Sequence, residues 1–309
     1  MEPISGHIWL DATTDRPHGA GSFSAPITCH SEDGILALKG EVRLGSIRIS
    51  SAHEAMRILE AYQQSGPAVL SALRGPFAIL LALPRHQKAM IAVDRMGIER
   101  MAWAQHSGQL AFGTSAEDVA QRISDRPQLE PQGIFDFMLG HMVPAPQTIF
   151  RGVQKLGPGM AIEFSHSHAN KLRYWRPNFE RPSGVDAAGL RDSVLPTLSR
   201  AIELVQPDVA TGSFLSGGLD SSTVTGLLKQ ANEASANAFS VGFGVAEYDE
   251  MEFADAASEH FGCRHFKYEV TADDIVDAIP IIAATYDEPF GNSSAVPTYY
   301  CARLAKQHG

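Results

Sequence analysis

The fold is decided around Ser216-Gly217-Gly218-Leu219-Asp220-Ser221-Ser222, which follows a predicted strand, Val209 to Leu215, and opens a predicted helix, Ser222 to Asn232. Two consecutive glycines let the backbone approach a ligand closely and accept a positive φ. The helix N-terminus offers unpaired N–H groups and the positive end of the helix dipole, and the serine hydroxyls add further donors. This stretch therefore predicts an anion site at the carboxyl end of a strand.

The carboxylate of Asp220 indicates that the anion is bound together with a metal ion. A carboxylate would repel bare phosphate, so its presence is best explained by Mg²⁺ lying between the two groups. The stretch has neither the Gly-Lys-Ser/Thr of a Walker loop nor the Gly-x-Gly-x-x-Gly of dinucleotide-binding folds. An ordinary Ser/Gly turn is the alternative, but it explains a bare Gly-Gly better than it explains all seven residues. We therefore predict a site for a metal-bound polyphosphate.

Strands alternate with helices on both sides of this stretch. The predicted helices are Leu190–Val205, Ser222–Asn232, Met251–Phe261 and one opened by the Thr271-x-x-Asp274 capping signature through Ala284, and the predicted strands are Val209–Leu215, Ala238–Phe243 and His265–Val270. Such alternation is typical of a parallel, doubly wound sheet, in which ligands bind at the carboxyl ends of the strands.

The first half of the chain differs in pattern. Residues 1–177 show short strand-like runs separated by turns, with a one-sided helix predicted from Ser51 to Gln63 and opened by a Ser-x-x-Glu signature. This mixture is typical of a layered α+β domain. A loop-like stretch at 178–190 is expected to link it to a second domain at 191–309.

The composition excludes several classes of function. A formal net charge of -10 argues against general attraction to nucleic acid or to an anionic membrane. The apolar run Ala78 to Leu83 is far shorter than the roughly 20 residues that span a bilayer, and Met1-Glu2-Pro3 does not resemble the start of a signal peptide. Cys29, Cys263 and Cys301 are odd in number and far apart, which favours a reducing cytoplasm over a disulfide framework.

Ser216 to Ser222 resembles the pyrophosphate loop of the asparagine synthetase family. Further resemblances to that family lie at Leu73-Arg74-Gly75-Pro76-Phe77-Ala78, at Asp94-Arg95-Met96-Gly97-Ile98, at Phe239-Ser240-Val241-Gly242-Phe243, and at Tyr286-Asp287-Glu288-Pro289-Phe290 followed by Ser294-Ala295-Val296-Pro297-Thr298-Tyr299. The last of these resembles the family's segment that approaches the substrate pocket. The resemblance covers most of the chain from about Gly34 onward and is strongest in the second half.

The resemblance implies a fold and a chemistry. The fold is an N-terminal, Ntn-amidohydrolase-like α-β-β-α layer of glutaminase type at 1–177, followed by an adenine-nucleotide α-hydrolase-like α/β parallel doubly wound domain at 191–309. The chemistry is adenylation of a carboxylate by ATP, release of pyrophosphate, and attack by an amine. Carried over to this sequence, the nucleotide would be flanked by Leu215 and Val241, pyrophosphate would be held by the stretch that includes Ser216, Gly217, Gly218 and Ser221, and Mg²⁺ would be bound by Asp220.

The first domain departs from the family pattern. Glutamine-using members make ammonia with a nucleophilic cysteine at the mature N-terminus, whose α-amine serves as base. Here position 2 is Glu2 and Cys29 is internal, while the family's Asn-Gly-Glu appears as Lys39-Gly40-Glu41. We interpret Asp94 as either a vestige of the glutamine site or a turn residue. We therefore expect an inactive glutaminase half and leave the catalytic residues unassigned.

The second domain departs from the family in length. The family's second phosphate motif, roughly Ser-Gly-x-Gly-x-Asp-Glu, would lie on the next strand, and it does not occur before Gly309. On this basis we expect a synthetase domain that is incomplete at its C-terminus and weak or inactive alone.

The substrates stay open between three hypotheses. The chain is expected to act as an asparagine synthetase that uses ammonia, or as a cyclase that uses an amine of its own small-molecule or peptide carboxylate, like the β-lactam and lasso-peptide macrolactam synthetases, which also lack the terminal cysteine. A hypothesis of another class is a non-catalytic relic that binds nucleotide. A homodimer is one assembly that the resemblance allows.

Overall fold

A computed structural model describes residues 3–9, 23–106, 108–165, 168–180, 184, 186–205, 207, 210–232, 236–245 and 249–309. The chain divides into two compact units: unit 1 consists of Met1–Asn178 and Asp287–Gly291, and unit 2 of Phe179–Tyr286 and Asn292–Gly309. The chain thus leaves unit 2 after Tyr286, contributes a short segment to unit 1, and returns. In the linker expected at 178–190, residues 181–183 and 185 lie outside the described residues.

Unit 1 is built on two large antiparallel sheets. Its strands are β1 (Ser5–Trp9), β2 (Phe23–Ser24), β3 (Ile27–His30), β4 (Ile35–Gly40), β5 (Arg43–Leu44), β6 (Ile47–Arg48), β7 (Leu73–Arg74), β8 (Phe77–Leu83), β9 (Lys88–Val93), β10 (Ala102–His106), β11 (Gln109–Gly113), β12 (Gln154–Lys155), β13 (Met160–Ser165) and β14 (His168–Arg173). One sheet has the order β12-β10-β11-β1-β2 and the other β14-β13-β9-β8-β4-β3, while β6-β5-β7 form a small third sheet.

The two large sheets share a buried core. That core includes Ile8 of β1, Phe112 of β11, Leu80 of β8 and Phe164 of β13. Each such side chain contributes about 1.5–3 kcal/mol when it is fully buried. β8 is buried along its whole length, because it is a central strand covered on both faces.

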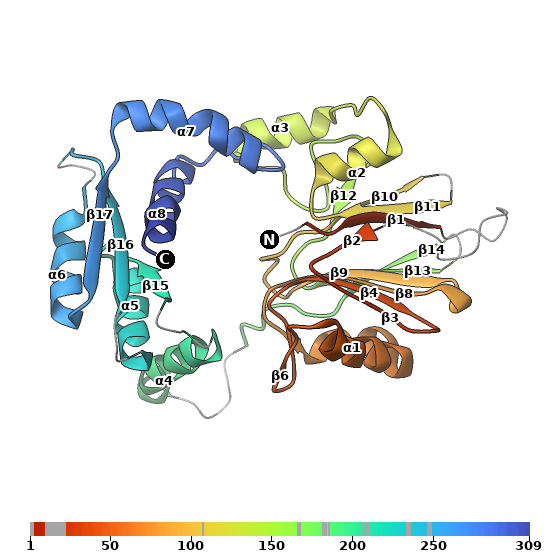
Figure 1. Ribbon diagram of the computed structural model, residues 1–309, viewed down its shortest axis with the longest axis horizontal. Helices are drawn as coiled ribbons and strands as arrows, with labels where there is room; N and C mark the ends of the chain where they lie inside the picture. The colour runs from red at the N-terminus through yellow and green to blue at the C-terminus, as the bar shows by residue number, and fades with distance from the viewer. Residues whose placement is uncertain are drawn as a thin grey trace. The chain divides into compact units, whose positions relative to one another are not determined.

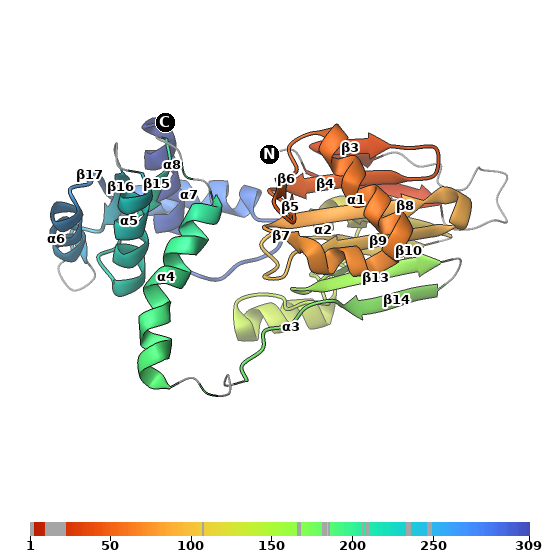
Figure 2. The ribbon, with the colours of Figure 1, turned by 90° about the horizontal axis from the view of Figure 1, so that it is seen from below.

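Helices cover the outer faces of the two sheets. The helices of unit 1 are α1 (Ala52–Ser65), α2 (Ala116–Ile123) and α3 (Pro131–Gly140), with the 3-10 turns η1 (Gly66–Ala72) and η2 (Pro84–His86). α1 packs on the six-stranded sheet through Ile58, Leu59 and Tyr62 (Figure 2). α2 packs on the five-stranded sheet through Val119. The resulting α-β-β-α order confirms the predicted architecture of the first half.

Unit 2 is a parallel sheet with helices on both faces (Figure 1). Its strands are β15 (Gly212–Phe214), β16 (Asn237–Gly242) and β17 (Arg264–Glu269), and its helices are α4 (Ala187–Val205), α5 (Leu219–Ala231), α6 (Met251–Phe261), α7 (Ala272–Thr285) and α8 (Ala295–Gln307). Neighbouring residues of β16 point to opposite faces. Ala238 packs with Ala254 of α6, whereas Phe239 packs with Leu304 of α8. This arrangement confirms the predicted doubly wound sheet.

The two capping signatures placed the starts of α1 and α7 correctly, whereas α4 begins at Ala187, three residues before the predicted Leu190. The Thr271 hydroxyl accepts a hydrogen bond from the backbone N–H of Asp274 and completes the predicted capping box of α7. At α1 the Ser51 hydroxyl accepts from the N–H of Glu54, while the Glu54 carboxylate accepts from the N–H of Ser50. The predicted start of α5 at Ser222 is wrong, because the helix begins at Leu219 with Gly218 as its N-cap. Glycine is accepted as an N-cap, so the turn ends earlier than the hydrophobic pattern indicated. Among the helices in the described part of the chain, none has the length and apolar character needed to cross a bilayer.

Candidate functional site

The Ser-Gly-Gly turn connects the carboxyl end of β15 to α5. A pocket of about 230 Å³, here named the loop pocket, lies at this end of the sheet. Four of the predicted site residues line it: Leu215, Ser216, Ser221 and Val241. Ser240 from β16 and Pro297 and Thr298 from α8 also line it; they lie in stretches that resemble the family, but no individual role was predicted for them from the sequence. Cys301 of α8, which lies in none of those stretches, lines it as well. Tertiary structure therefore assembles the pocket from three separate segments.

The serine hydroxyls close the turn on itself. The Oγ atoms of Ser216 and Ser221 lie 3.0 Å apart, and the Ser216 N–H donates to Ser221 Oγ at 3.2 Å. The Gly218 N–H donates to Ser216 Oγ at 3.3 Å. Hydrogen bonds from these groups to an anion would be shorter and roughly twice as strong. The turn therefore holds hydroxyl and N–H donors that a phosphate can take over.

The two glycines of the turn have different physical roles. Gly217 has φ +84°, and a Cβ there would lie 2.5 Å from the backbone N of Ala254 in α6. The packing of α6 therefore requires glycine at this position. Gly218 has φ −67°, and a Cβ there would meet only Ser216 Oγ, at 3.4 Å. Neither its backbone conformation nor its packing requires glycine, so the open space beside Gly218 indicates room for a ligand close to the backbone.

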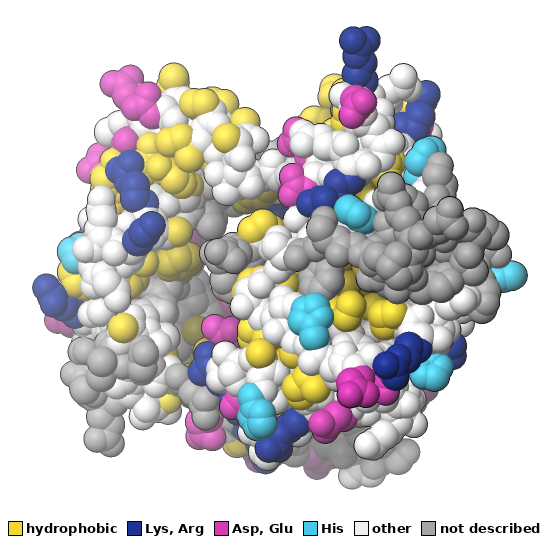
Figure 3. Space-filling view, turned by 45° about the vertical axis from the view of Figure 1, so that its right-hand side comes forward, with side chains coloured by type: hydrophobic (Ala, Val, Ile, Leu, Met, Phe, Trp, Pro, Cys, Tyr) yellow, Lys and Arg dark blue, Asp and Glu magenta, His cyan; other side chains and the backbone are white. Residues whose placement is uncertain are grey.

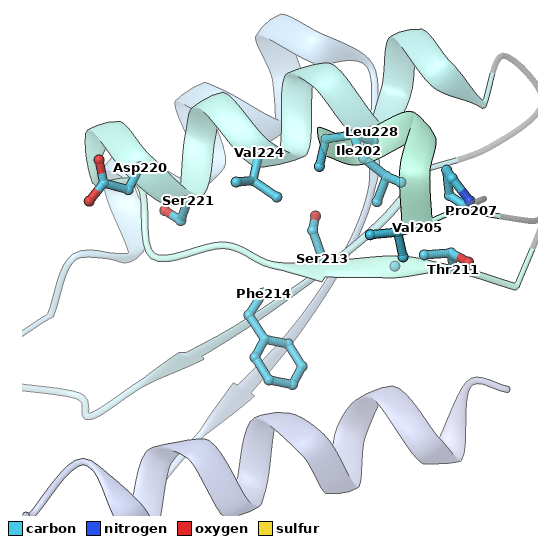
Figure 4. A pocket seen from close by; sticks show the side chains of 11 residues that line it. Ile202, Val205, Pro207, Thr211, Ser213, Phe214, Asp220, Ser221, Val224 and Leu228 are labelled. Atoms are coloured by element: carbon cyan, nitrogen blue, oxygen red, sulfur yellow. The ribbon is translucent and has the colours of Figure 1, made fainter. Parts of the chain in front are cut away.

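Asp220 lies in the first turn of α5 and is exposed. It lines a neighbouring pocket of about 480 Å³ that shares Ser221 with the loop pocket and continues along α5 to Val224 and Leu228 (Figure 4). In the described residues, no group of three or more His, Cys, Asp or Glu side chains is arranged to hold a metal ion. Mg²⁺ commonly takes one or two carboxylates together with phosphate oxygens and water, so a lone Asp220 fits such an ion only when polyphosphate is also bound.

Buried hydroxyls anchor both ends of the turn. Thr225 Oγ1 donates to the carbonyl of Ser221 at 2.8 Å and lies 2.8 Å from Ser213 Oγ. The hydroxyl of Ser240 donates to the carbonyl of Leu215 at 2.5 Å. A buried hydroxyl is rarely left unpaired, so these contacts fix the turn to β15, β16 and α5.

An open apolar pocket of about 740 Å³ adjoins the loop pocket, and both are lined by Pro297. The lining comes from the ends of β16 and β17 and from α7 and α8, and includes Phe243, Val270, Ile275 and Val296. Among the described residues that line this pocket, none is charged. Hydrophobic side chains gather on the surface around α7, where Ile275, Val276 and Ile279 are 40–66% exposed (Figure 3).

In unit 1, Asp94 is buried, and its carboxylate binds backbone N–H groups. It accepts from Met96 at 3.0 Å, from Ile98 at 3.1 Å, from Glu99 at 2.9 Å and from Phe77 at 3.3 Å. These contacts are those of a turn residue, and they use the lone pairs that would bind a glutamine amine. A vestigial role in glutamine binding stays a prediction.

Two other residues at which the sequence departs from the glutaminase pattern, Lys39 and Cys29, also have contacts within unit 1. Lys39 forms an ion pair with Glu99 at 2.8 Å, and both side chains are mostly buried. Cys29 belongs to the core beneath α1, and burial raises the pKa of its thiol. A buried thiol with a raised pKa is a poor nucleophile. The described residues of unit 1 therefore present no activated cysteine.

The acidic pair Asp287 and Glu288 belongs to unit 1, although the chain on both sides belongs to unit 2. The carboxylate of Asp287 accepts from the hydroxyl of Ser115 and from the N–H of Ala116, both at 2.6 Å, at the N-terminus of α2. Glu288 accepts from a backbone N–H and forms a mostly buried ion pair with Lys155. Of the segment expected to approach the substrate, only the part from Ser294 onward lines the pockets described above.

Comparison with known proteins gives matches over both halves. Residues 193–309 match the asparagine synthase family model and residues 36–175 the glutamine amidotransferase domain model. A putative glutamine-hydrolysing asparagine synthetase of Mycobacterium tuberculosis is 30% identical over 262 residues, covering 81% of this chain and 40% of that protein. The glutamine-hydrolysing asparagine synthetase 1 of Bacillus subtilis is 24% identical over 275 residues, covering 88% of this chain and 43% of that protein. The chain thus spans less than half the length of these relatives.

Proposed function

This chain belongs to the asparagine synthetase family, and we propose that it uses ATP to form an amide bond. In the proposed reaction an oxygen of the substrate carboxylate attacks the α-phosphorus of ATP, and the bond to the pyrophosphate oxygen breaks. An amine nitrogen then attacks the acyl carbon of the adenylate, AMP leaves with the electron pair, and the nitrogen loses a proton. The main support for this proposal is the open space at Gly218. Beside that space, the hydroxyls of Ser216 and Ser221 and the N–H of Gly218 now bind one another and could bind phosphate instead.

Each residue of the turn has a role in this proposal. Leu215 and Val241 line the loop pocket from two strands and would flank the nucleotide. The hydroxyls of Ser216 and Ser221 would exchange their mutual contact for phosphate oxygens, and so would the N–H of Gly218, which now donates to Ser216 Oγ. Gly217 is proposed to contribute to the same phosphate loop through its backbone. Mg²⁺ held by Asp220 would neutralise phosphate charge. The protein thus contributes orientation and charge stabilisation.

The nitrogen donor is proposed to be ammonia or a substrate amine. Cys29 is buried in the core, and Asp94 is bound to a turn, so the glutaminase half is proposed to be inactive. The cysteines in the structure are free, which supports a cytoplasmic location. Assembly as a homodimer stays a proposal, and sedimentation velocity tests it.

The apolar pocket favours a second candidate within the same class. Free aspartate carries two carboxylates and an ammonium group, which need polar partners when they are desolvated. A pocket lined by Phe243, Val270, Ile275 and Val296 suits a larger substrate with an apolar part, as in a cyclase. Carboxylate-dependent exchange of pyrophosphate with aspartate, but not with apolar acids, would exclude this candidate.

The proposed function is tested by exchange of labelled pyrophosphate into ATP in the presence of candidate carboxylates and Mg²⁺. Asp220→Ala is expected to remove the Mg²⁺ dependence of ATP binding while the fold survives. Asp273→Ala is the matched control, because Asp273 is an exposed acidic residue in the first turn of α7. A wild-type chain that binds no ATP contradicts the proposal. Binding without carboxylate-dependent exchange favours the non-catalytic relic instead.

A further inference from the structure

Behind the loop pocket, three side chains from three elements are joined in series. Ser240 of β16 lies with its Oγ 2.6 Å from Nε2 of His265 in β17. Nδ1 of the same imidazole lies 3.0 Å from Asp255 of α6. Ser240 is 2% exposed and the His265 side chain 9%, whereas the Asp255 side chain is 47% exposed, so it is the contact between Ser240 and His265 that water does not readily replace. The series ends at the loop, because the Ser240 hydroxyl also reaches the Leu215 carbonyl at 2.5 Å.

The number of protons in this series depends on the charge of His265. A carboxylate only accepts, so Nδ1 carries a proton toward Asp255. With a neutral imidazole, Nε2 is then an acceptor, and the single hydroxyl proton of Ser240 is shared between Nε2 and the Leu215 carbonyl. With an imidazolium, Nε2 donates to Ser240 Oγ, and the hydroxyl proton goes to the Leu215 carbonyl alone. All contacts of the series are satisfied together only in the charged form.

The charged groups that face His265 are Asp255 of α6 and Lys267 of β17. Lys267 Nζ binds both carboxylate oxygens of Asp255, at 2.7 and 2.9 Å, and mainly this contact lowers the pKa of Asp255. Burial lowers the pKa of His265, and the attraction of Asp255 opposes that shift. His265 is therefore expected to change charge on the acid side of the ordinary histidine value.

We propose that His265 is a positioning residue, whose protonation directs the Ser240 hydroxyl wholly to the Leu215 carbonyl and so anchors the residue that precedes the Ser-Gly-Gly turn. The last paired residues of β15 and β16 are Phe214 and Phe239, so the ladder ends one residue before Leu215. The Ser240 side chain therefore extends the anchoring of the strand to the turn. Leu215 and Ser240 both line the loop pocket, which is the proposed ATP site. The expected effect of His265 on ATP binding therefore rests on the proposed function.

The inference is tested first without nucleotide, by NMR on the whole chain. The carbonyl carbon of Leu215, detected through the amide of Ser216, and the ring of His265 are expected to titrate with one midpoint. In Ser240→Ala the His265 ring still titrates, but the Leu215 carbonyl no longer responds. In Asp255→Asn both midpoints move to lower pH, because the opposing charge is removed. A Leu215 carbonyl that does not respond while His265 titrates overturns the inference, and so does a His265 ring that stays neutral down to the pH at which the chain unfolds.

The second measurement is the affinity for ATP with Mg²⁺ at two pH values, about one unit below and about one unit above the His265 midpoint found by NMR, where the imidazole is mostly charged and mostly neutral, respectively. Wild type is expected to bind about five-fold more tightly at the lower pH, the value of one ordinary hydrogen bond. Ser240→Ala is expected to lose this His265-dependent difference. Equal pH dependence in both proteins overturns the inference. Absence of ATP binding in wild type would refute the proposed function alone, and the NMR titration would still decide the role of His265.

Discussion

Replacement of Gly217 by alanine should destabilise unit 2, because two penalties add. A positive φ of +84° costs a residue with a side chain about 1–2 kcal/mol. The new Cβ would also lie 2.5 Å from backbone atoms of Phe253 and Ala254, so the start of α6 would have to move. Overpacking of this kind costs about 1–3 kcal/mol. The expected loss is about 2–5 kcal/mol, a large part of the 5–15 kcal/mol that stabilises a typical domain.

Gly218→Ala is the matched control, one residue away in the same turn. Its Cβ would meet only Ser216 Oγ at 3.4 Å, so the expected loss of stability is limited to about 1 kcal/mol, the cost of alanine at an N-cap. The same Cβ would fill the proposed phosphate space and displace a hydrogen bond to a charged group worth about 1.5–3 kcal/mol, so ATP affinity should fall at least about ten-fold. Gly218→Ala thus separates loss of binding from loss of stability.

Urea unfolding followed by circular dichroism measures both variants. Tryptophan fluorescence provides an internal reference, because Trp9, Trp103 and Trp175 all belong to unit 1. The circular dichroism transition of Gly217→Ala should move to lower urea concentration more than its fluorescence transition does. Equal stability of the two variants, or a Gly217→Ala loss below about 0.5 kcal/mol, would refute the reasoning from φ and close approach.

Three further outcomes are expected. Lys155→Met leaves the mostly buried Glu288 without its cation and should cost unit 1 about 3–5 kcal/mol by tryptophan fluorescence, and adding Glu288→Gln should restore part of the loss. Asp94→Asn replaces a carboxylate that accepts several backbone N–H groups, and should lower the stability of unit 1 by about 1–3 kcal/mol in the same assay, whereas an unchanged midpoint would contradict the turn role. Burial raises the pKa of the Cys301 thiol to about 11, so as the pH rises the thiol ionises in the unfolded chain before it ionises in the folded one. The free energy of unfolding should therefore fall between about pH 9 and pH 11. In urea titrations, Cys301→Ala should show a smaller decline over the same range.

The sequence by itself determined the local structure of this protein. The glycines of Ser216 to Ser222 predicted the turn, the alternation of strands and helices predicted the parallel sheet, and the capping signature at Thr271 predicted the start of α7. These features depend on neighbours within a few residues, through φ preferences, helix capping and hydrophobic periodicity. For the same reason the motifs identified the family before the fold was known.

Only the tertiary structure decided which distant residues meet. Ser240 contacts the Leu215 carbonyl and also His265, which lies on the neighbouring strand opposite Ala238, two residues before Ser240. The pairing of parallel strands brings these residues together, and no local pattern encodes that pairing. Asp287 lies in the segment predicted to approach the substrate, and only the structure shows that its carboxylate binds Ser115 and Ala116 at the N-terminus of α2 in unit 1. Such contacts are selected by burial and by the need of each buried polar group for a partner, and both conditions exist only after the chain has folded.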